Sequence, residues 1–432
     1  MWRDHWHPEF AESHGCLVIL NHSAHYGAMF DFPIPLPEEG DVDAALDEID
    51  AWCVEKGVPP SYGVVPETER ERLLKRYPYT TVDNDRLWQD YFYHAEDLST
   101  FAGRRYSGQR NHINKFRKLY PDAVYRELTP ADRDKVDAFW HEFHKVFNKE
   151  DADARMEVCY ARRLMEQVGA EWARTGCVEI DGQIAALALA EVCGDTLVCH
   201  IEKALPRYEG VYPFIVQSFA AAYSSGLPWI NREDDAGDRG LRTSKLQYLP
   251  AFLGAKVRIL ARNELSALET VPVLKTERLI LDGLREEDKP LYNRLCLDDE
   301  RNRWWGYDYR DDLEGEPAEE YFLSVAREDF QKKQAVNFAI RLDGRFIGEA
   351  VVYRFDYKGG AELGCRILPE YAGNGYGAEA FRRAAEWSLY TLGLYSLKAK
   401  CFHENEASRR MLSSCMRPAG EDEKFLYFEK KV

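Results

Sequence analysis

The stretch that decides the fold lies near the end of the chain: Ala361-Glu-Leu-Gly-Cys-Arg-Ile-Leu-Pro-Glu-Tyr-Ala-Gly-Asn-Gly-Tyr-Gly-Ala-Glu-Ala380. Its first part alternates apolar with other residues and closes at a proline, which predicts a strand. Three glycines at every second position, Gly373, Gly375 and Gly377, lead into helical periodicity over residues 378–394. A strand that opens through glycines into a helix presents unpaired backbone N–H groups at the positive end of the helix dipole. Such an arrangement binds phosphate oxygens.

The spacing of these glycines separates several kinds of phosphate loop. A dinucleotide fold needs G-x-G-x-x-G and a P-loop needs Gly-Lys-Ser/Thr, and this stretch has neither. A G-x-G-x-G series alone is as typical of an ordinary glycine turn. Ala372-Gly-Asn-Gly-Tyr-Gly377 resembles the acyl-CoA pyrophosphate loop of the GNAT acyltransferases, written Gln/Arg-x-x-Gly-x-Gly/Ala, with Ala372 in place of the usual basic or amide residue. The resemblance implies that acetyl-CoA is bound by Ile367, Leu368, Ala372, Gly373, Asn374, Gly375, Tyr376, Gly377, Ala378 and Asn405.

The surrounding sequence extends the resemblance to about residues 273–432. Thr276-Glu-Arg-Leu-Ile-Leu281 looks like a first strand, Asp343-Gly344 marks a hairpin turn, and residues 396–402 form another expected strand. The motif that follows, from His403 to Leu412, completes a similarity to the ribosomal-protein N-acetyltransferase branch. The resemblance implies a mixed α/β (α+β) domain that transfers an acetyl group to a primary amine of a small molecule or peptide.

Acyl transfer to an amine needs a base, donors for the oxyanion and a proton for the leaving thiolate. Glu362 is positioned to take the amine proton through water, or it is a plain strand-edge glutamate. Ser408 either protonates the thiolate or caps the helix that it begins. Asn405 orients the cofactor or caps the same helix, and Tyr427 is the reserve acid.

Composition limits the class of protein. With 432 residues, 45% hydrophobic and 30% charged, the chain is expected to be a globular protein of two or three domains. No apolar run reaches membrane-span length, the start lacks an apolar signal core, and ten scattered cysteines suit a reducing cytoplasm. Clustered Cys and His are absent from the sequence, so no metal site is expected. The net charge of −17, mostly in residues 1–272, argues against broad nucleic-acid binding.

The densest basic stretch is residues 104–118, expected to continue as a helix from about Gly108. It is either a solvated helix face or a phosphate-facing patch that binds tRNA. Farther on, residues 132–147 and 159–172 predict helices, and Asp181-Gly182 predicts a hairpin.

Three segments of this half, at 110–116, 208–213 and 229–250, resemble the family of the phosphatidylglycerol lysyltransferase C-terminal domain, over about residues 20–262. The resemblance implies tandem GNAT-like lobes, in relatives that move an aminoacyl group from tRNA onto a lipid. The candidate residues are Arg110, Asn111, His112, Lys115, Glu209, Tyr212, Asn231, Asp234, Asp235, Arg242 and Lys245.

The expected architecture is three GNAT-like lobes in tandem, each a mixed sheet flanked by helices. The expected boundaries are a degenerate lobe at 1–105, a second lobe at 106–262, a linker at 263–272 and the acetyltransferase domain at 273–432. Two alternatives stay open for the first half: an aminoacyl-tRNA-dependent transferase, or a non-catalytic module that binds substrate. Trp304, Trp305 and Tyr307 fall in the expected acceptor loop, where they contact substrate or pack in the core.

Overall fold

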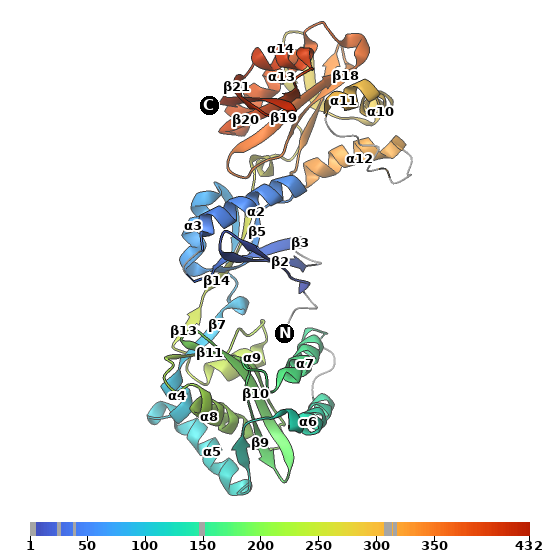
Figure 1. Cartoon of the computed structure of the whole chain (residues 1–432). Coiled ribbons are helices and arrows are strands. Elements are labelled where there is room, and N and C mark those ends of the chain that lie inside the picture. Colours follow the sequence, from blue (N-terminus) through green and yellow to red (C-terminus); the bar gives the residue numbers. More distant parts are fainter. Residues whose placement is uncertain (1–5, 24–26, 38–39, 147–151, 306–312, 314–317) are drawn as a thin grey trace. The chain divides into compact units, whose positions relative to one another are not determined.

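The computed structural model describes residues 6–23, 27–37, 40–146, 152–305, 313 and 318–432 (Figure 1). The chain divides into two compact units. Unit 1 consists of residues 1–8, 22–24 and 83–257, and unit 2 of residues 9–21, 25–82 and 258–432. The units hold three mixed sheets flanked by helices, which confirms the predicted fold class. The boundaries expected at 105, 262 and 272 stay predictions.

Unit 1 is built on one seven-stranded sheet with the order β13-β7-β12-β11-β10-β9-β8. Its strands are β7 (Asp90–His94), β8 (Val124–Arg126), β9 (Arg174–Ile180), β10 (Gln183–Cys193), β11 (Thr196–Ala204), β12 (Trp229–Asn231) and β13 (Phe252–Gly254). Its helices are α4 (Ala95–Thr100), α5 (Ser107–Leu119), α6 (Arg133–Val146), α7 (Ala152–Leu164), α8 (Val211–Tyr223) and α9 (Arg239–Leu246).

Both faces of this sheet are covered. One face packs on α4, α5 and α8, and the other on α6 and α7. Strand β10 is therefore buried on both sides, which explains its unbroken run of small and apolar residues from Ile184 to Ala190. The predicted β9–β10 hairpin is confirmed, and it turns on Asp181 and Gly182 with φ of 48° and 78°.

Unit 2 contains two sheets. The first has the order β1-β2-β3-β5-β14-β6, with β4 paired to β2. Its strands are β1 (Glu9–Ser13), β2 (Cys16–Ser23), β3 (Gly27–Asp31), β4 (Ile34–Pro35), β5 (Ser61–Pro66), β6 (Tyr79–Asp83) and β14 (Lys256–Arg262). Helices α2 (Val42–Lys56) and α3 (Arg70–Arg76) accompany it, and α2 starts at an Asp41 cap whose carboxylate accepts from the Ala44 N–H.

The second sheet of unit 2 has the order β15-β16-β17-β18-β19-β20-β22-β21. Its strands are β15 (Leu274–Lys275), β16 (Leu279–Gly283), β17 (Val336–Leu342), β18 (Arg345–Tyr353), β19 (Gly360–Ile367), β20 (Ser396–Phe402), β21 (Arg417–Glu421) and β22 (Phe425–Lys431). Its helices are α10 (Lys289–Cys296), α11 (Asp299–Trp305), α12 (Ala318–Gln331), α13 (Tyr376–Trp387) and α14 (Glu406–Ser413).

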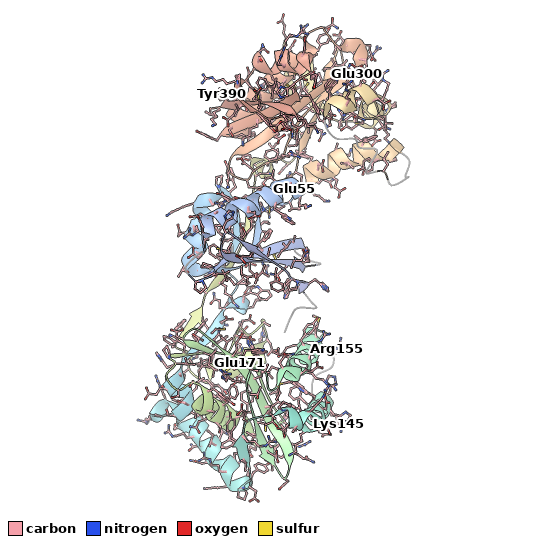
Figure 2. All side chains as sticks on the ribbon, viewed as in Figure 1. Glu55, Lys145, Arg155, Glu171, Glu300 and Tyr390 are labelled. Atoms are coloured by element: carbon pink, nitrogen blue, oxygen red, sulfur yellow. The ribbon has the colours of Figure 1, made fainter. Side chains whose placement is uncertain are left out.

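Helices cover this sheet on both sides, as on unit 1. The main core lies under α13, whose Phe381, Ala384 and Ala385 contact the apolar side of the strands. The opposite face packs on α10 and α12. After Trp387 the helix widens into a π turn, Ser388–Leu392, which leaves Tyr390 64% exposed on the surface (Figure 2).

Two segments, residues 152–172 and 263–272, add detail to what the sequence predicts. The helix expected at 159–172 begins earlier, at Ala152, and ends at Leu164, because a 3-10 turn and Gly169 at φ 91° break the helical backbone before Trp172. Residues 263–272 include a 3-10 turn, Glu264–Ala267, whose Leu265 is fully buried in the core of the second unit-2 sheet. Among the described residues, no helix is long and apolar enough to cross a membrane.

Candidate functional site

The glycine loop forms a tight joint between β19 and α13. A 3-10 turn, Pro369–Tyr371, follows the buried Leu368, and Gly373 and Gly375 then adopt φ of 81° and 78°. Gly375 is the residue that precedes α13, so the free N–H groups of the first helical turn begin at Tyr376. The loop is braced from inside, because the Asn374 side chain donates to the carbonyls of Tyr371 and Ala372.

Gly377 lies on the inner side of the joint, where the helix crosses the end of β19. A Cβ there would be 3.4 Å from Cγ1 of Ile367 and 3.7 Å from the sulfur of Met411. Both distances are ordinary van der Waals contacts, so α13 packs closely on the strand at this point. The structure therefore gathers the predicted cofactor residues from Ile367 to Ala378 into one joint, and it places Asn405 on the separate helix α14.

The sheet opens beside this joint. Strands β19 and β20 are parallel and pair only through Gly360↔Ser396, Ala361↔Leu397 and Glu362↔Lys398. Beyond that point β19 stays paired with β18, and β20 with β22. A gap therefore separates residues 363–367 from residues 399–402, with backbone groups of β19 along its edge.

Glu362 lies at the closed end of this gap. Its Oε1 is 3.4 Å from Nη1 of Arg354, while Oε2 is buried without a hydrogen-bond partner among the described residues. A buried carboxylate oxygen left without a donor is costly, so it marks a place where a proton donor or a positive group is expected to bind.

The other three candidates lie across the gap. The Asn405 side chain accepts from the Ser408 N–H at 3.0 Å, so Asn405 caps α14, which is one of the two roles considered for it. Ser408 itself is half-buried in the first turn of that helix. The Tyr427 hydroxyl donates to Asp422 at 2.6 Å, and this hydrogen bond raises the pKa of Tyr427 and helps to lower that of Asp422 to about 2.

Helix α11 closes one face of the sheet beside Glu362. The Trp305 ring lies against Gly364, where an added Cβ would come within 2.7 Å of it, and the Arg366 guanidinium is 4.6 Å from its centre. Arg366 is itself buried and ion-paired with Glu349 at 2.5 Å. Trp304 packs against Phe402 of β20, so the two tryptophans reach strands on both sides of the gap. Tyr307 lies outside the described residues.

In unit 1, six of the predicted residues form one network around β12 and the segment after it: Tyr212, Asn231, Asp234, Asp235, Arg242 and Lys245. Asp235 is fully buried; burial alone would raise its pKa, but hydrogen bonds from Arg242 and Tyr91 outweigh it and lower the pKa. Asp234 lies next to it, and burial raises its pKa. The Lys245 ammonium donates to the Arg232 and Glu233 carbonyls, at 2.5 and 3.2 Å, and to that of Asp234.

Burial, followed by the nearby charge of Arg232, lowers the pKa of Lys245 to about 8. Arg232 is ion-paired with Glu202 at 2.6 Å and stacks on Tyr248, and its Nη2 donates to the hydroxyl of Tyr212. The Asn231 side chain donates to Asp90 at 3.1 Å, which links the end of β12 to the start of β7. Arg232 was not among the predicted residues, although it stood inside the segment that carried them.

The basic helix α5 lies apart from that network. Nη1 of Arg110 donates to the carbonyls of Phe101 and Gly103, and Lys115 pairs with Glu209 at 2.6 Å. These two cations are therefore already engaged by groups of the same unit, while Asn111 and His112 are exposed. The arrangement favours the solvated-face interpretation of residues 104–118 over the phosphate-facing one.

Gly210 precedes α8 with φ 83°, in the same position as Gly375 before α13. The surroundings differ, because a Cβ on Gly210 would lie 2.5 Å from the His112 carbonyl oxygen and 3.0 Å from Cβ of Phe116. Helix α5 thus covers the start of α8, whereas Gly373 has no atom within 4 Å of its Cβ position. Of the two joints, the one in unit 2 is open to a phosphate.

Among the described residues, no group of three His, Cys, Asp or Glu side chains is placed to hold a metal ion.

Comparisons with known proteins cover both halves of the chain. Residues 1–256 match the family model of the phosphatidylglycerol lysyltransferase C-terminal domain, and residues 278–415 match that of the GNAT acetyltransferase domain. The uncharacterized N-acetyltransferase YoaA of Bacillus subtilis is 28% identical over 144 residues, which are 33% of this chain and 80% of that protein.

Two solved structures are also similar. A conserved protein of unknown function from Bacteroides thetaiotaomicron has 28% identity and a TM-score of 0.53, covering 60% of this chain and 87% of that one. RimJ of Mycobacterium smegmatis, solved in complex with CoA-disulfide, has 20% identity and a TM-score of 0.33, covering 38% of this chain and 88% of that one. The GNAT match confirms the predicted enzyme class, acyl-CoA-dependent N-acetyl transfer with acetyl-CoA as the cofactor.

Proposed function

We propose that this chain, which belongs to the family of the phosphatidylglycerol lysyltransferase C-terminal domain and carries a GNAT acetyltransferase domain, acetylates an amine at the gap between β19 and β20. One observation carries the proposal. The buried Oε2 of Glu362 has no partner among the described residues, and it lies where the parallel pairing of the two strands ends.

The proposed cofactor site begins at the glycine loop. The diphosphate of acetyl-CoA binds the free N–H groups at the start of α13, beside Gly373, whose Cβ position has no described atom within 4 Å. The pantetheine arm then lies along the edge of β19, pairing with backbone groups of residues 363–367 as an added strand would. This path brings the thioester to Glu362, and a β19 N–H is available to the carbonyl oxygen that becomes the oxyanion.

Glu362 takes the proton of the incoming amine, directly or through one water molecule, and the neutral amine attacks the thioester carbon. The collapse of the tetrahedral intermediate releases CoA as a thiolate, which needs a proton. Ser408 is the proposed donor of that proton, because it lies in the first turn of α14 across the gap from Glu362, whereas the Tyr427 hydroxyl already directs its proton at Asp422. Asn405 holds Ser408 in place through its cap of α14.

The acceptor approaches past α11. The indole of Trp305 lies two residues along β19 from Glu362 and on the same face of the sheet, because Glu362 and Gly364 pair with Tyr353 and Val351 of β18. A carboxylate on this path attracts an ammonium group before the ammonium loses its proton. A primary amine of a small molecule or of a peptide is therefore the proposed acceptor.

The aminoacyl-tRNA alternative rests on unit 1, and the lowered pKa of Lys245 is the observation in its favour. Arg110 and Lys115, two of the cations proposed to meet RNA, instead contact groups of the same unit. Salt-dependent tRNA binding that is lost in Lys115→Ala would revive it. The third possibility, a unit 1 that binds substrate without catalysis, predicts no aminoacyl transfer in that assay.

The proposal is tested by release of free thiol from acetyl-CoA in the presence of a panel of primary amines and short peptides, with mass spectrometry of the acceptors. Acceptor-dependent thiol release by the wild type, and none by Glu362→Gln, supports the proposal. Equal release by both proteins would remove Glu362 from the reaction.

A further inference from the structure

Arg278 borders the glycine loop from outside, three residues after β15. Its Nη1 donates to the Asn374 carbonyl at 3.1 Å, and its guanidinium carbon lies 4.6 Å from the centre of the Tyr376 ring. A Cβ on Gly375 would be 3.5 Å from Nη2. The guanidinium therefore touches three successive residues at the start of α13.

The positive charge of Arg278 is unusual at the start of a helix. The beginning of a helix carries positive partial charge and ordinarily favours an anion. Here the chain adds a cation, balanced by Glu379 of the first turn, whose Oε2 lies 2.7 Å from Nε and 2.6 Å from Nη2. Burial acts to raise the pKa of Glu379, but hydrogen bonds from Thr276 and Arg278 outweigh it and lower the pKa. Glu379 thus stays charged and fixes the guanidinium.

Donors remain on Arg278 after these contacts. A guanidinium has five N–H groups, and Nη1 and Nη2 each keep one that is not directed at Asn374 or Glu379. The side chain is 43% exposed and lies beside Gly375, next to the start of α13. A fork of N–H groups next to backbone N–H groups matches the oxygens of a diphosphate.

We propose that Arg278 binds the diphosphate of acetyl-CoA and supplies the positive charge that the loop itself lacks at Ala372. The proposal rests on the proposed function, since it requires the cofactor at the start of α13. The competing role is mechanical: Arg278 braces the loop by tying Glu379 to Asn374 and touches no ligand.

Two variants separate these roles, because both break the Arg278–Glu379 pair but only one removes the cation. CoA binding is measured by calorimetry on the full chain for wild type, Arg278→Gln, Arg278→Lys and Glu379→Gln, with thermal melts to verify folding. Direct binding predicts that Arg278→Gln weakens CoA about 10- to 100-fold. It also predicts that Glu379→Gln changes affinity by less than about 3-fold, and that Arg278→Lys lies between wild type and Arg278→Gln.

Similar losses in Arg278→Gln and Glu379→Gln would overturn the proposal in favour of the brace. Unchanged CoA affinity in Arg278→Gln would overturn it as well. A wild type that does not bind CoA would instead reject the proposed function, and the proposal with it. An Arg278→Gln protein that fails to fold leaves Arg278→Lys and Glu379→Gln to decide, since a brace predicts a loss in Glu379→Gln.

Discussion

Glu362 and Lys398 form the last pair of the parallel register between β19 and β20. After this pair, β19 remains paired with β18 and β20 with β22, but the two strands no longer pair with each other. The sheet is therefore continuous on one side of the Glu362–Lys398 pair and open on the other. The carboxylate that we propose as the base is therefore positioned by an ordinary strand pairing, and the proposed space for the thioester begins one residue later.

We expect Glu362→Gln to lower kcat about 100-fold or more, because general-base catalysis contributes about 10²–10⁴. Glutamine keeps the shape and the polar atoms, so the affinity for acetyl-CoA should not change. Steady-state kinetics with an acceptor found by the thiol-release screen measures the effect. Glu429→Gln, on β22, is the matched control and should retain full activity. Equal kcat in the wild type and both variants would assign the base to another group.

Gly364→Ala tests whether Trp305 of α11 lines the path of the amine acceptor. The added methyl group would come within 2.7 Å of the Trp305 ring, so α11 must shift away from β19. We expect the KM for the amine to rise about 10-fold while the Kd for acetyl-CoA stays the same, because the shift affects the acceptor side. A matched Gly108→Ala change in α5 is at a glycine that, like Gly364, has no positive φ; it meets no described atom within 4 Å and should leave both constants unchanged. A loss confined to acetyl-CoA affinity would contradict this assignment.

The buried Glu264 makes stability depend on pH. Burial raises the pKa of its carboxyl to about 7, and Oε2 has no hydrogen-bond partner among the described residues. From about pH 4.5 to 7 the folded protein keeps a proton that the unfolded chain releases, so the free energy of unfolding falls as pH rises through this window. Glu264→Gln removes the effect, and we expect it to gain about 2–3 kcal/mol over wild type between pH 5 and pH 8.

Urea unfolding at both pH values measures this gain. Glu55→Gln, at an exposed glutamate of α2, is the control that should show no such difference (Figure 2). A Glu264→Gln variant whose stability relative to wild type is the same at pH 5 and pH 8 would show that Glu264 is ionised in the folded protein throughout.

Local patterns predicted much of the C-terminal domain. The strand, the glycine joint and the helix after it are adjacent in sequence, so alternation and turn residues were enough to place β19, Gly375 and α13. The Asp181-Gly182 and Asp343-Gly344 turns were confirmed for the same reason, since both residues adopt the positive φ that such hairpins require.

Contacts between distant segments could not be predicted from the sequence. Arg278 lies about a hundred residues before the loop that it touches, and nothing in its own neighbourhood indicates a phosphate. The cover of Gly210 by α5 likewise depends on tertiary packing, which the sequence around Gly210 does not indicate. The sequence left the role of the basic stretch open because partners such as Glu209 for Lys115 lie in a distant segment, the turn before α8.

The most direct test of the account is calorimetric binding of acetyl-CoA to wild type, Gly375→Glu and Gly393→Glu. Both glycines have positive φ, 78° and 98°, so both variants carry similar backbone strain and the same added charge. Only Gly375 borders the start of α13, whereas no atom lies within 4 Å of the Gly393 Cβ position. The account predicts wild-type affinity in Gly393→Glu and a loss of about 100-fold or more in Gly375→Glu. Equal acetyl-CoA affinity in all three proteins would place the cofactor elsewhere and contradict the central claim.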